Sequence, residues 1–293
     1  MSGQLKEVRN RIESVKSTQQ ITKAMKMVSA AKLRRAQDAI MQMRPYAQKL
    51  QEMLSNIVSA ENELSIKLAE ERPVNNVLLI VITSDRGLAG AYNANITKLA
   101  QSVIAEKYAA QHAAGKVTIW NVGKKGWESL TKNRYKTSDR YKDLLHDISF
   151  NHVQEMAKEA VIAFEKGEFD MVEIVYSRFK NAATQIFTTE QFLPIPKVQP
   201  QEGKNKNIDF IFEPQKEQLI TELMPKILNT QLFKAVLDAN ASEQGARMTA
   251  MDKASDNANE ILRSLKIAYN RARQAAITTE LTEIVSGAAA LQE

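Results

Sequence analysis

The chain has 293 residues, of which 44% are hydrophobic and 25% are charged, and this composition excludes a disordered or collagen-like chain. It contains no cysteine, which excludes disulfide bonds, thiol catalysis and cysteine-ligated metals. The net charge of +6 favours an acidic partner, such as a nucleic acid, an anionic membrane face or an acidic protein. No apolar run is long enough to cross a bilayer, and the N-terminus lacks the apolar segment of a secretory signal.

The first zone, residues 1–57, predicts one long helix because it is almost free of glycine and aromatic residues. Apolar residues recur in steps of three and four from Leu5 to Val15 and again from Leu33 to Ile57, with an irregular patch between them. Pro45 lies inside this pattern and predicts a kink or a break.

The middle zone, residues 58–214, holds 15 of the 18 aromatic residues and alternates strand and helix patterns. Strands are expected at 77–83, 117–122, 171–176, 185–193 and 210–212, helices at 93–113, 124–132 and 150–165, and a polar loop at 199–207. This alternation predicts an α/β domain with a mostly parallel sheet and leaves room for an antiparallel edge strand.

The last zone, residues 215–293, predicts a second long helix, with a kink or break at Pro225. Its apolar stripe is formed by Met251, Ala254, Ala258, Ile261, Leu265, Ala268, Ala272 and Ala275. After Ala275 the stripe moves to another face, formed by Ile277, Leu281, Ile284, Ala288 and Leu291. This second face has no partner helix inside the chain, which predicts a partner outside it.

The lengths of the two terminal zones indicate how they are used. As single helices, 57 and 79 residues would reach about 85 Å and about 120 Å. A globule of this chain length has a diameter of only about 50 Å. The zones are therefore either broken into a bundle or extended as a shaft, and the sustained seven-residue repeat favours an antiparallel coiled-coil shaft.

Two glycine loops follow expected strands, where α/β proteins often bind phosphate. In the segment 84–96 (SDRGLAGAYNANI), Gly87 and Gly90 match neither the dinucleotide nor the P-loop pattern, so a tight turn capped by Asp85 is favoured over a nucleotide site. The segment 123–126 (GKKG) lacks the Walker spacing, and a plain strand–helix connection is favoured there too.

No metal or catalytic site is predicted. The three histidines, His112, His146 and His152, show no ligand spacing, and no nucleophile-elbow motif supports a hydrolase triad.

Positive charge is concentrated at the N-terminus, where residues 1–40 carry nine basic and three acidic side chains. Their net charge of +6 equals that of the whole chain, which predicts a basic helix face for acidic protein loops or a nucleic acid. The near absence of aromatic residues disfavours binding of single-stranded nucleic acid.

Four segments resemble the gamma subunits of F-type ATP synthases. The C-terminal run 277–290 (ITTELTEIVSGAAA) is similar to the family signature I-T-x-E-x-x-E-x-x-x-G-A, and the runs 21–28 (ITKAMKMV) and 247–257 (RMTAMDKASDN) match as well. The loop 84–90 also matches, with Ala89 where many members have cysteine.

The resemblance implies an antiparallel coiled coil of the N- and C-terminal helices (1–57 and 215–293) plus a Rossmann-like α/β middle domain (58–214). It further implies a non-catalytic central rotor without cofactor or metal, present as one copy per complex. The coil would stand inside three alpha and three beta subunits, and the foot would meet the epsilon subunit and the membrane ring of c subunits. Proton flow would turn this shaft and drive ATP synthesis in the beta subunits.

The resemblance also assigns contacts. Met25, Lys26, Arg273, Gln274, Thr278 and Glu280 occupy positions that meet the acidic lever and loops of the beta subunits, and the small residues 288–290 supply an apolar tip. Basic Lys23, Lys26, Lys32, Arg34 and Arg35 would face acidic loops. The absence of a transit peptide and of a cysteine-bearing insert favours a bacterial protein, peripheral to the cytoplasmic side of the membrane.

Two alternatives come from other classes. A basic coiled-coil adaptor or nucleic-acid-binding protein would bind DNA or RNA with a steep salt dependence. A nucleotide-dependent α/β enzyme would use the loop between Gly87 and Gly90.

Overall fold

The computed structural model describes residues 2–59, 67–195 and 216–290, which belong to two compact units. The coil unit comprises Met1–Ser29 and Met248–Glu293, and the sheet unit comprises Ala30–Arg247. Helices α1 (Ser2–Ser59) and α6 (Lys216–Ala290) contribute to both units. The expected loop at 199–207 and strand at 210–212 lie outside the described residues.

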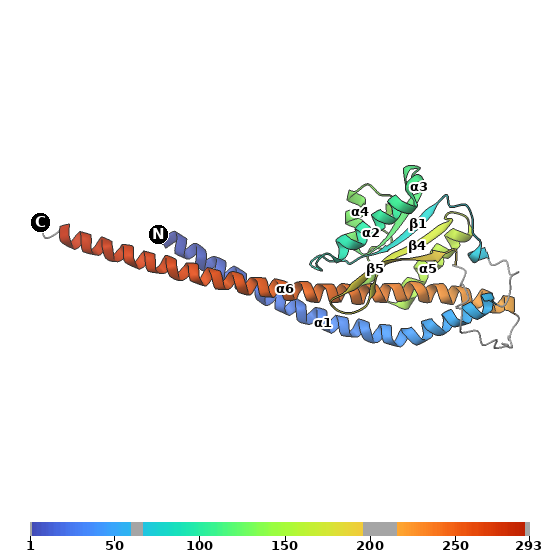
Figure 1. Ribbon diagram of the computed structural model, residues 1–293, viewed down its shortest axis with the longest axis horizontal. Coiled ribbons are helices and arrows are strands. Elements are labelled where there is room, and N and C mark those ends of the chain that lie inside the picture. The colour runs from blue at the N-terminus through green and yellow to red at the C-terminus, as the bar shows by residue number, and fades with distance from the viewer. Residues whose placement is uncertain (1, 60–66, 196–215, 291–293) are drawn as a thin grey trace. The chain divides into compact units, whose positions relative to one another are not determined.

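In the coil unit, α1 and α6 pack side by side in opposite directions (Figure 1). Three hydrogen-bonded pairs give the register of the two helices. The residue number falls on α6 as it rises on α1, so the helices are antiparallel. The pairs are Gln19 with Asn259, Thr22 with Ser255, and Lys26 with Asp252. The expected antiparallel coiled coil is therefore confirmed.

Both helices have a run of shielded positions that alternate steps of three and four without interruption, as a coiled coil requires. On α1 they are Leu5, Val8, Ile12, Val15, Gln19, Thr22, Lys26 and Ser29. On α6 they are Met251, Ser255, Ala258, Leu262, Leu265, Tyr269, Ala272 and Ala276.

The predicted α6 stripe is wrong at three positions, since Ile261, Ala268 and Ala275 are exposed. In each case the next residue along the chain turns inward instead. A shift of one residue moves the side chain by about 100° around the helix axis. The observed repeat includes the polar Ser255, which an apolar pattern leaves out.

The two prolines do not end their helices. Pro45 lies inside α1 and Pro225 inside α6, so the alternative of a break at either position is wrong. A proline removes one backbone hydrogen bond, and buried neighbours such as Ile40 and Leu228 keep each helix packed across that gap. No helix in the described part of the chain is both long and apolar enough to cross a membrane.

The sheet unit contains five strands in the order β3-β2-β1-β4-β5. They are β1 (Val77–Ile82), β2 (Val117–Val122), β3 (Thr137–Ser138), β4 (Met171–Phe179) and β5 (Gln185–Leu193). The first four pair in parallel and β5 runs antiparallel to β4. The expected Rossmann-like arrangement with an antiparallel edge is confirmed, although β4 is longer than predicted and β3 was not anticipated.

Both faces of the sheet are covered by helices, which explains why all six residues of β1 are buried. Leu78, Ile80 and Ile82 pack with α5 (Phe150–Glu165) and with the part of α6 in this unit. The alternate residues of β1 pack with α2 (Tyr92–Lys107) and α4 (Lys124–Lys132) on the other face (Figure 1).

The predicted helix 93–113 is divided at Tyr108 into α2 and α3 (Ala109–Ala113). At Tyr108 the backbone leaves the helical region, with φ −127° and ψ 27°. Its ring is buried in the same cluster as Val103 and Ile104, so tertiary packing outweighs local helix propensity here. Two short 3-10 turns, η1 (Lys67–Ala69) and η2 (Leu144–His146), complete the unit.

Candidate partner-binding surfaces

The basic side chains of α1 point largely to solvent. Lys23 is exposed in the coil unit, and Lys32, Arg34 and Arg35 are exposed in the sheet unit. Met25 is half-buried beside the seam of the coil. The four basic residues therefore present cationic groups to solvent.

Lys26 differs from the other basic residues because it already has an acidic neighbour in the chain. Its ammonium group forms an ion pair with Asp252 of α6, with 41% and 49% of the two side chains exposed. An ion pair this exposed contributes little stability. The Lys26 ammonium group can therefore exchange Asp252 for a carboxylate of a partner at low energetic cost.

The predicted contact residues on α6 are also accessible. Arg273, Gln274, Thr278 and Glu280 are all exposed. They lie well away from the α1 group, because Lys26 faces Asp252 and Arg273 follows 21 residues later. At 1.5 Å per residue this is about 30 Å along α6. The structure thus forms two patches on the coil unit rather than one.

The last turns of α6 leave their apolar side chains uncovered, as predicted. Every described side chain from Glu280 to Ala288 is exposed. Leu281, Ile284 and Val285 are 57%, 66% and 68% exposed. Since α1 begins at Ser2, which the register places opposite about residue 275, this part of α6 extends beyond its partner helix.

The crevice where α/β sheets usually bind ligands is filled by the chain itself. That crevice lies outside the carboxyl ends of β1 and β4, where the strand order reverses. The Ser242 hydroxyl donates to the Ser177 carbonyl at the end of β4, at 3.0 Å. A side chain at Gly245 would begin 3.1 Å from the Ala182 carbonyl oxygen, so α6 passes close to this loop.

Arg247 joins α6 to the first glycine loop. Its guanidinium donates to the carbonyl of Gly87 and, at 3.1 Å, to that of Arg86. It also pairs with the buried Glu243 at 2.6 Å. Burial raises the pKa of the Glu243 carboxyl, and the Arg247 charge opposes this rise. The loop therefore presents its carbonyl groups to an arginine of the same chain.

Asp85 caps a different element from the one expected. It accepts the backbone N–H of Lys124, the first residue of α4, at 3.4 Å. The turn of its own loop is held by the Ser84 hydroxyl, which donates to the Arg86 carbonyl at 2.7 Å. Burial raises the pKa of the Asp85 carboxyl.

The second glycine loop is a close-packed strand–helix connection, as favoured from the sequence. The Thr83 hydroxyl accepts the N–H of Gly126 at 2.9 Å and so takes the place an anion would have at the start of α4. A Cβ atom at Gly123 or Gly126 would lie within 2.8 Å of that hydroxyl oxygen. Both glycines are therefore required by packing against Thr83.

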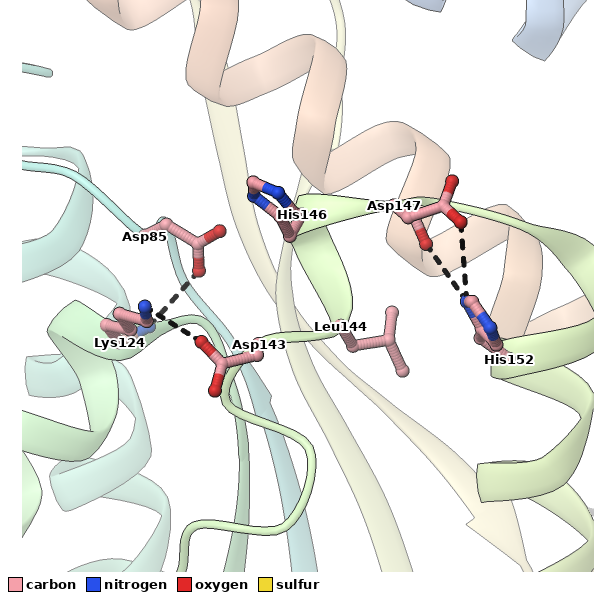
Figure 2. Close-up of a pocket in the computed structure, with 7 residues that line it drawn as sticks. All are labelled: Asp85, Lys124, Asp143, Leu144, His146, Asp147 and His152. Atoms are coloured by element: carbon pink, nitrogen blue, oxygen red, sulfur yellow. Dashed lines mark hydrogen bonds and ion pairs between the residues drawn. The ribbon is translucent and has the colours of Figure 1, made fainter.

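A cavity of about 400 Å³ lies beside these loops, and two histidines line it (Figure 2). Lys124 pairs with Asp143 at 2.8 Å, which lowers the pKa of the Asp143 carboxyl. The His152 ring is 3.2 Å from the Asp147 carbonyl oxygen. Among the described residues no group of three potential ligands could hold a metal ion. The third histidine, His112, stacks on Tyr135.

The comparisons with known proteins identify the family. The model of the family described as ATP synthase matches residues 4–291. The protein named ATP synthase gamma chain from Cytophaga hutchinsonii is 54% identical over 290 residues, covering 98% of each chain. The chain belongs to the ATP synthase gamma chain family. The ATP synthase gamma chain of Chlorobaculum parvum is 50% identical, covering 99% of each chain.

Solved structures agree on the fold of this gamma chain. A chain from the Euglena gracilis mitochondrial ATP synthase, described as OSCP/F1/c-ring in rotational state 3, has a TM-score of 0.70 at 24% identity. The similarity covers 99% of this chain and 95% of that one. The resemblance inferred from the motifs is thus confirmed at the level of family and fold.

Sequence reasoning missed the residues that join the elements of this gamma chain. Asp252, Ser255 and Asn259 lie within or next to a segment identified by its resemblance, but no pattern assigned them contacts with α1. Arg247 stands at the start of the same segment, and its contact with the first glycine loop depends on the tertiary fold. The three-and-four spacing of Leu5 to Val15, continued through the polar positions 19, 22, 26 and 29, is the signal that could have found the α1 side of the seam.

Proposed function

We propose that this gamma chain is the central rotor of a proton-translocating F-type ATP synthase. In this role it couples rotation of a membrane ring of c subunits to ATP synthesis by three alpha and three beta subunits. The observation that carries the proposal is a continuous α6 helix with an uncovered apolar end, in a chain of the gamma chain family. A rotor needs a helix that partners surround but do not grip tightly.

The two patches on the coil unit support different contacts in this role. Lys23, Met25 and Lys26 on α1, and Arg273, Gln274, Thr278 and Glu280 on α6, would meet the acidic lever and loops of successive beta subunits. Because the patches are about 30 Å apart along the helix, each can contact a different level of the surrounding ring. Lys32, Arg34 and Arg35, which belong to the sheet unit, would face further acidic loops.

The end of α6 would turn within an apolar sleeve formed by the alpha and beta subunits. Leu281, Ile284 and Val285 supply apolar surface and carry no charge. They therefore cannot form ion pairs that would hold the rotor in one position. The neighbouring alanines are small. Such a contact excludes water while it allows rotation.

We infer that this chain is not itself catalytic. The switch-point crevice holds α6, and the two glycine loops are bonded to Arg247 and Thr83 of the same chain. We further propose one copy per complex, contact of the sheet unit with the epsilon subunit, and a peripheral position on the cytoplasmic side of a bacterial membrane. The division into shaft helices (1–57 and 215–293) and a middle domain (58–214) is part of the same proposal.

Reversal of charge at Arg273 tests the role. In the complex reconstituted with alpha, beta and membrane subunits, Arg273→Glu should reduce ATP-driven proton transport more than tenfold relative to hydrolysis. Arg271→Glu is the matched control, because Arg271 is also an exposed arginine, in the same turn but on a different face of α6. Unchanged coupling in Arg273→Glu, or equal losses in both variants, would contradict the proposal.

A further inference from the structure

Asp238 is a buried acid on the part of α6 that packs against the sheet. Its side chain is only 3% exposed, between neighbours Leu237 and Ala239 that are buried as well. Among the described residues, its Oδ1 atom has no hydrogen-bond partner. One oxygen of a carboxylate in such a place lacks both water and a donor, so the neutral acid is favoured.

Charged groups on four elements act on the Asp238 carboxyl. Lys234 lies one turn earlier on α6, Arg44 lies on α1, and Arg178 lies on β4. These three cations favour the carboxylate, whereas Glu190 of β5 disfavours it. Burial outweighs the cations and raises the pKa of the Asp238 carboxyl to about 6.

Tyr176 of β4 does not compete for this proton. Its hydroxyl donates a hydrogen bond to Glu190, and the ring is fully buried. Burial and the neighbouring carboxylates raise the pKa of the Tyr176 hydroxyl far above neutrality. Tyr176 thus remains a donor to Glu190 while Asp238 gains or loses its proton.

We propose that Asp238 is a pH-sensing residue that controls how tightly α6 packs against β4 and β5. Uptake of one proton from solvent removes a buried negative charge beside Glu190 and tightens the packing. Release of that proton restores the charge and loosens the packing. The proposal concerns the sheet unit of the chain itself and is independent of the proposed rotor function.

The sign of the effect follows from the two states of the group. The pKa of Asp238 is higher in the folded chain than its usual value of 3.8, so the folded state binds the proton more tightly. The stabilisation is fully present below that usual value and is lost as the pH rises through about 6. Between pH 5 and pH 7.5 the opening equilibrium should change about tenfold.

Hydrogen exchange of the full chain, corrected for the intrinsic pH dependence of amide exchange, tests this proposal. In peptides that cover β4, β5 and residues 224–247, protection should be about tenfold greater at pH 5 than at pH 7.5. Asp238→Asn should reduce the difference to less than about threefold and keep protection high at pH 7.5; the buried Glu243 of the same segment accounts for any remainder. Asp256→Asn removes an exposed acid of the same helix and should leave the difference intact.

A second variant keeps the proposal falsifiable if Asp238→Asn does not fold. Glu190→Gln removes the like charge beside Asp238, so the midpoint of the pH dependence should move to lower pH. An unmoved midpoint would overturn the proposal. So would equal protection of the unaltered chain at pH 5 and pH 7.5, or an undiminished pH dependence in Asp238→Asn.

Discussion

Thr22 of α1 and Ser255 of α6 share a hydrogen bond of 2.8 Å inside the seam of the coil unit, where both side chains are buried. Each hydroxyl also lies within hydrogen-bond distance of a backbone carbonyl of its own helix, Thr22 of Gln19 and Ser255 of Met251. Because two hydroxyls have only two protons, one donates across the seam and the other donates to its own helix. The pair thus joins two helices without leaving a buried polar atom unsatisfied. Polar groups matched in this way at seam positions specify helix pairing at a cost in stability.

The seam pair should show energetic coupling. In a double-mutant cycle with Thr22→Val and Ser255→Ala, each single change should destabilise the full chain by about 1 kcal/mol, and the coupling should be about 0.5–1 kcal/mol. Denaturant unfolding followed by circular dichroism measures these values. Strictly additive single effects would show that the two hydroxyls do not interact in solution.

Loss of Arg247 should destabilise the sheet unit strongly. Arg247→Met leaves Glu243 buried without its partner and frees the carbonyls of Arg86 and Gly87, at a cost of about 3 kcal/mol. The double variant Glu243→Gln/Arg247→Met should regain part of this loss, because no unpaired charge is then buried. Chemical unfolding measures both. A loss below about 0.5 kcal/mol in Arg247→Met would contradict the assigned contacts.

The two glycine loops should differ in their tolerance of a methyl group. Gly126→Ala places a Cβ atom 2.7 Å from the Thr83 hydroxyl oxygen and should cost about 1–3 kcal/mol. Gly87→Ala is the control, since nothing lies within 4 Å of its added Cβ atom. Thermal unfolding of the two variants gives the comparison, and equal stabilities would be inconsistent with the packing of Thr83 against α4.

The end of α6 should matter for assembly but not for the stability of the chain. Ile284 and Val285 are exposed, so Ile284→Ser/Val285→Ser should change the free energy of unfolding by less than about 0.5 kcal/mol. If the apolar end is enclosed by alpha and beta subunits, the same variant should form the complex with at least tenfold lower affinity. Thermal unfolding and titration with the alpha–beta hexamer separate the two effects. Full affinity would indicate that this end stays in solvent.

The sequence predicts most of the fold because its signals are local and regular. β1 is a continuous run of apolar residues, and helices α4 and α5 begin and end where their patterns do. The seam of the coil was harder to predict, because it includes the buried polar residues Gln19, Thr22 and Ser29. A pattern of apolar residues alone leaves these positions out. Ile21 and Val28 are exposed, so the apolar residues of this irregular patch do not mark the seam.

The candidate site was predictable in part for a similar reason. Exposed basic residues on α1 follow from charge counting, and the uncovered end of α6 follows from the shift of its stripe. The pairing of Lys26 with Asp252 and the contact of Arg247 with Gly87 depend on residues more than 150 positions apart. Only the tertiary fold brings such groups together.

Rotation of the chain inside an alpha–beta hexamer tests the central claim most directly. Because the chain has no cysteine, Ala113→Cys on the exposed end of α3 gives a single attachment point for a visible probe. With the hexamer fixed to a surface and ATP supplied, the rotor account predicts continuous rotation of the probe in one direction that stops when ATP is removed. ATP hydrolysis by the assembled complex with a stationary probe would contradict it.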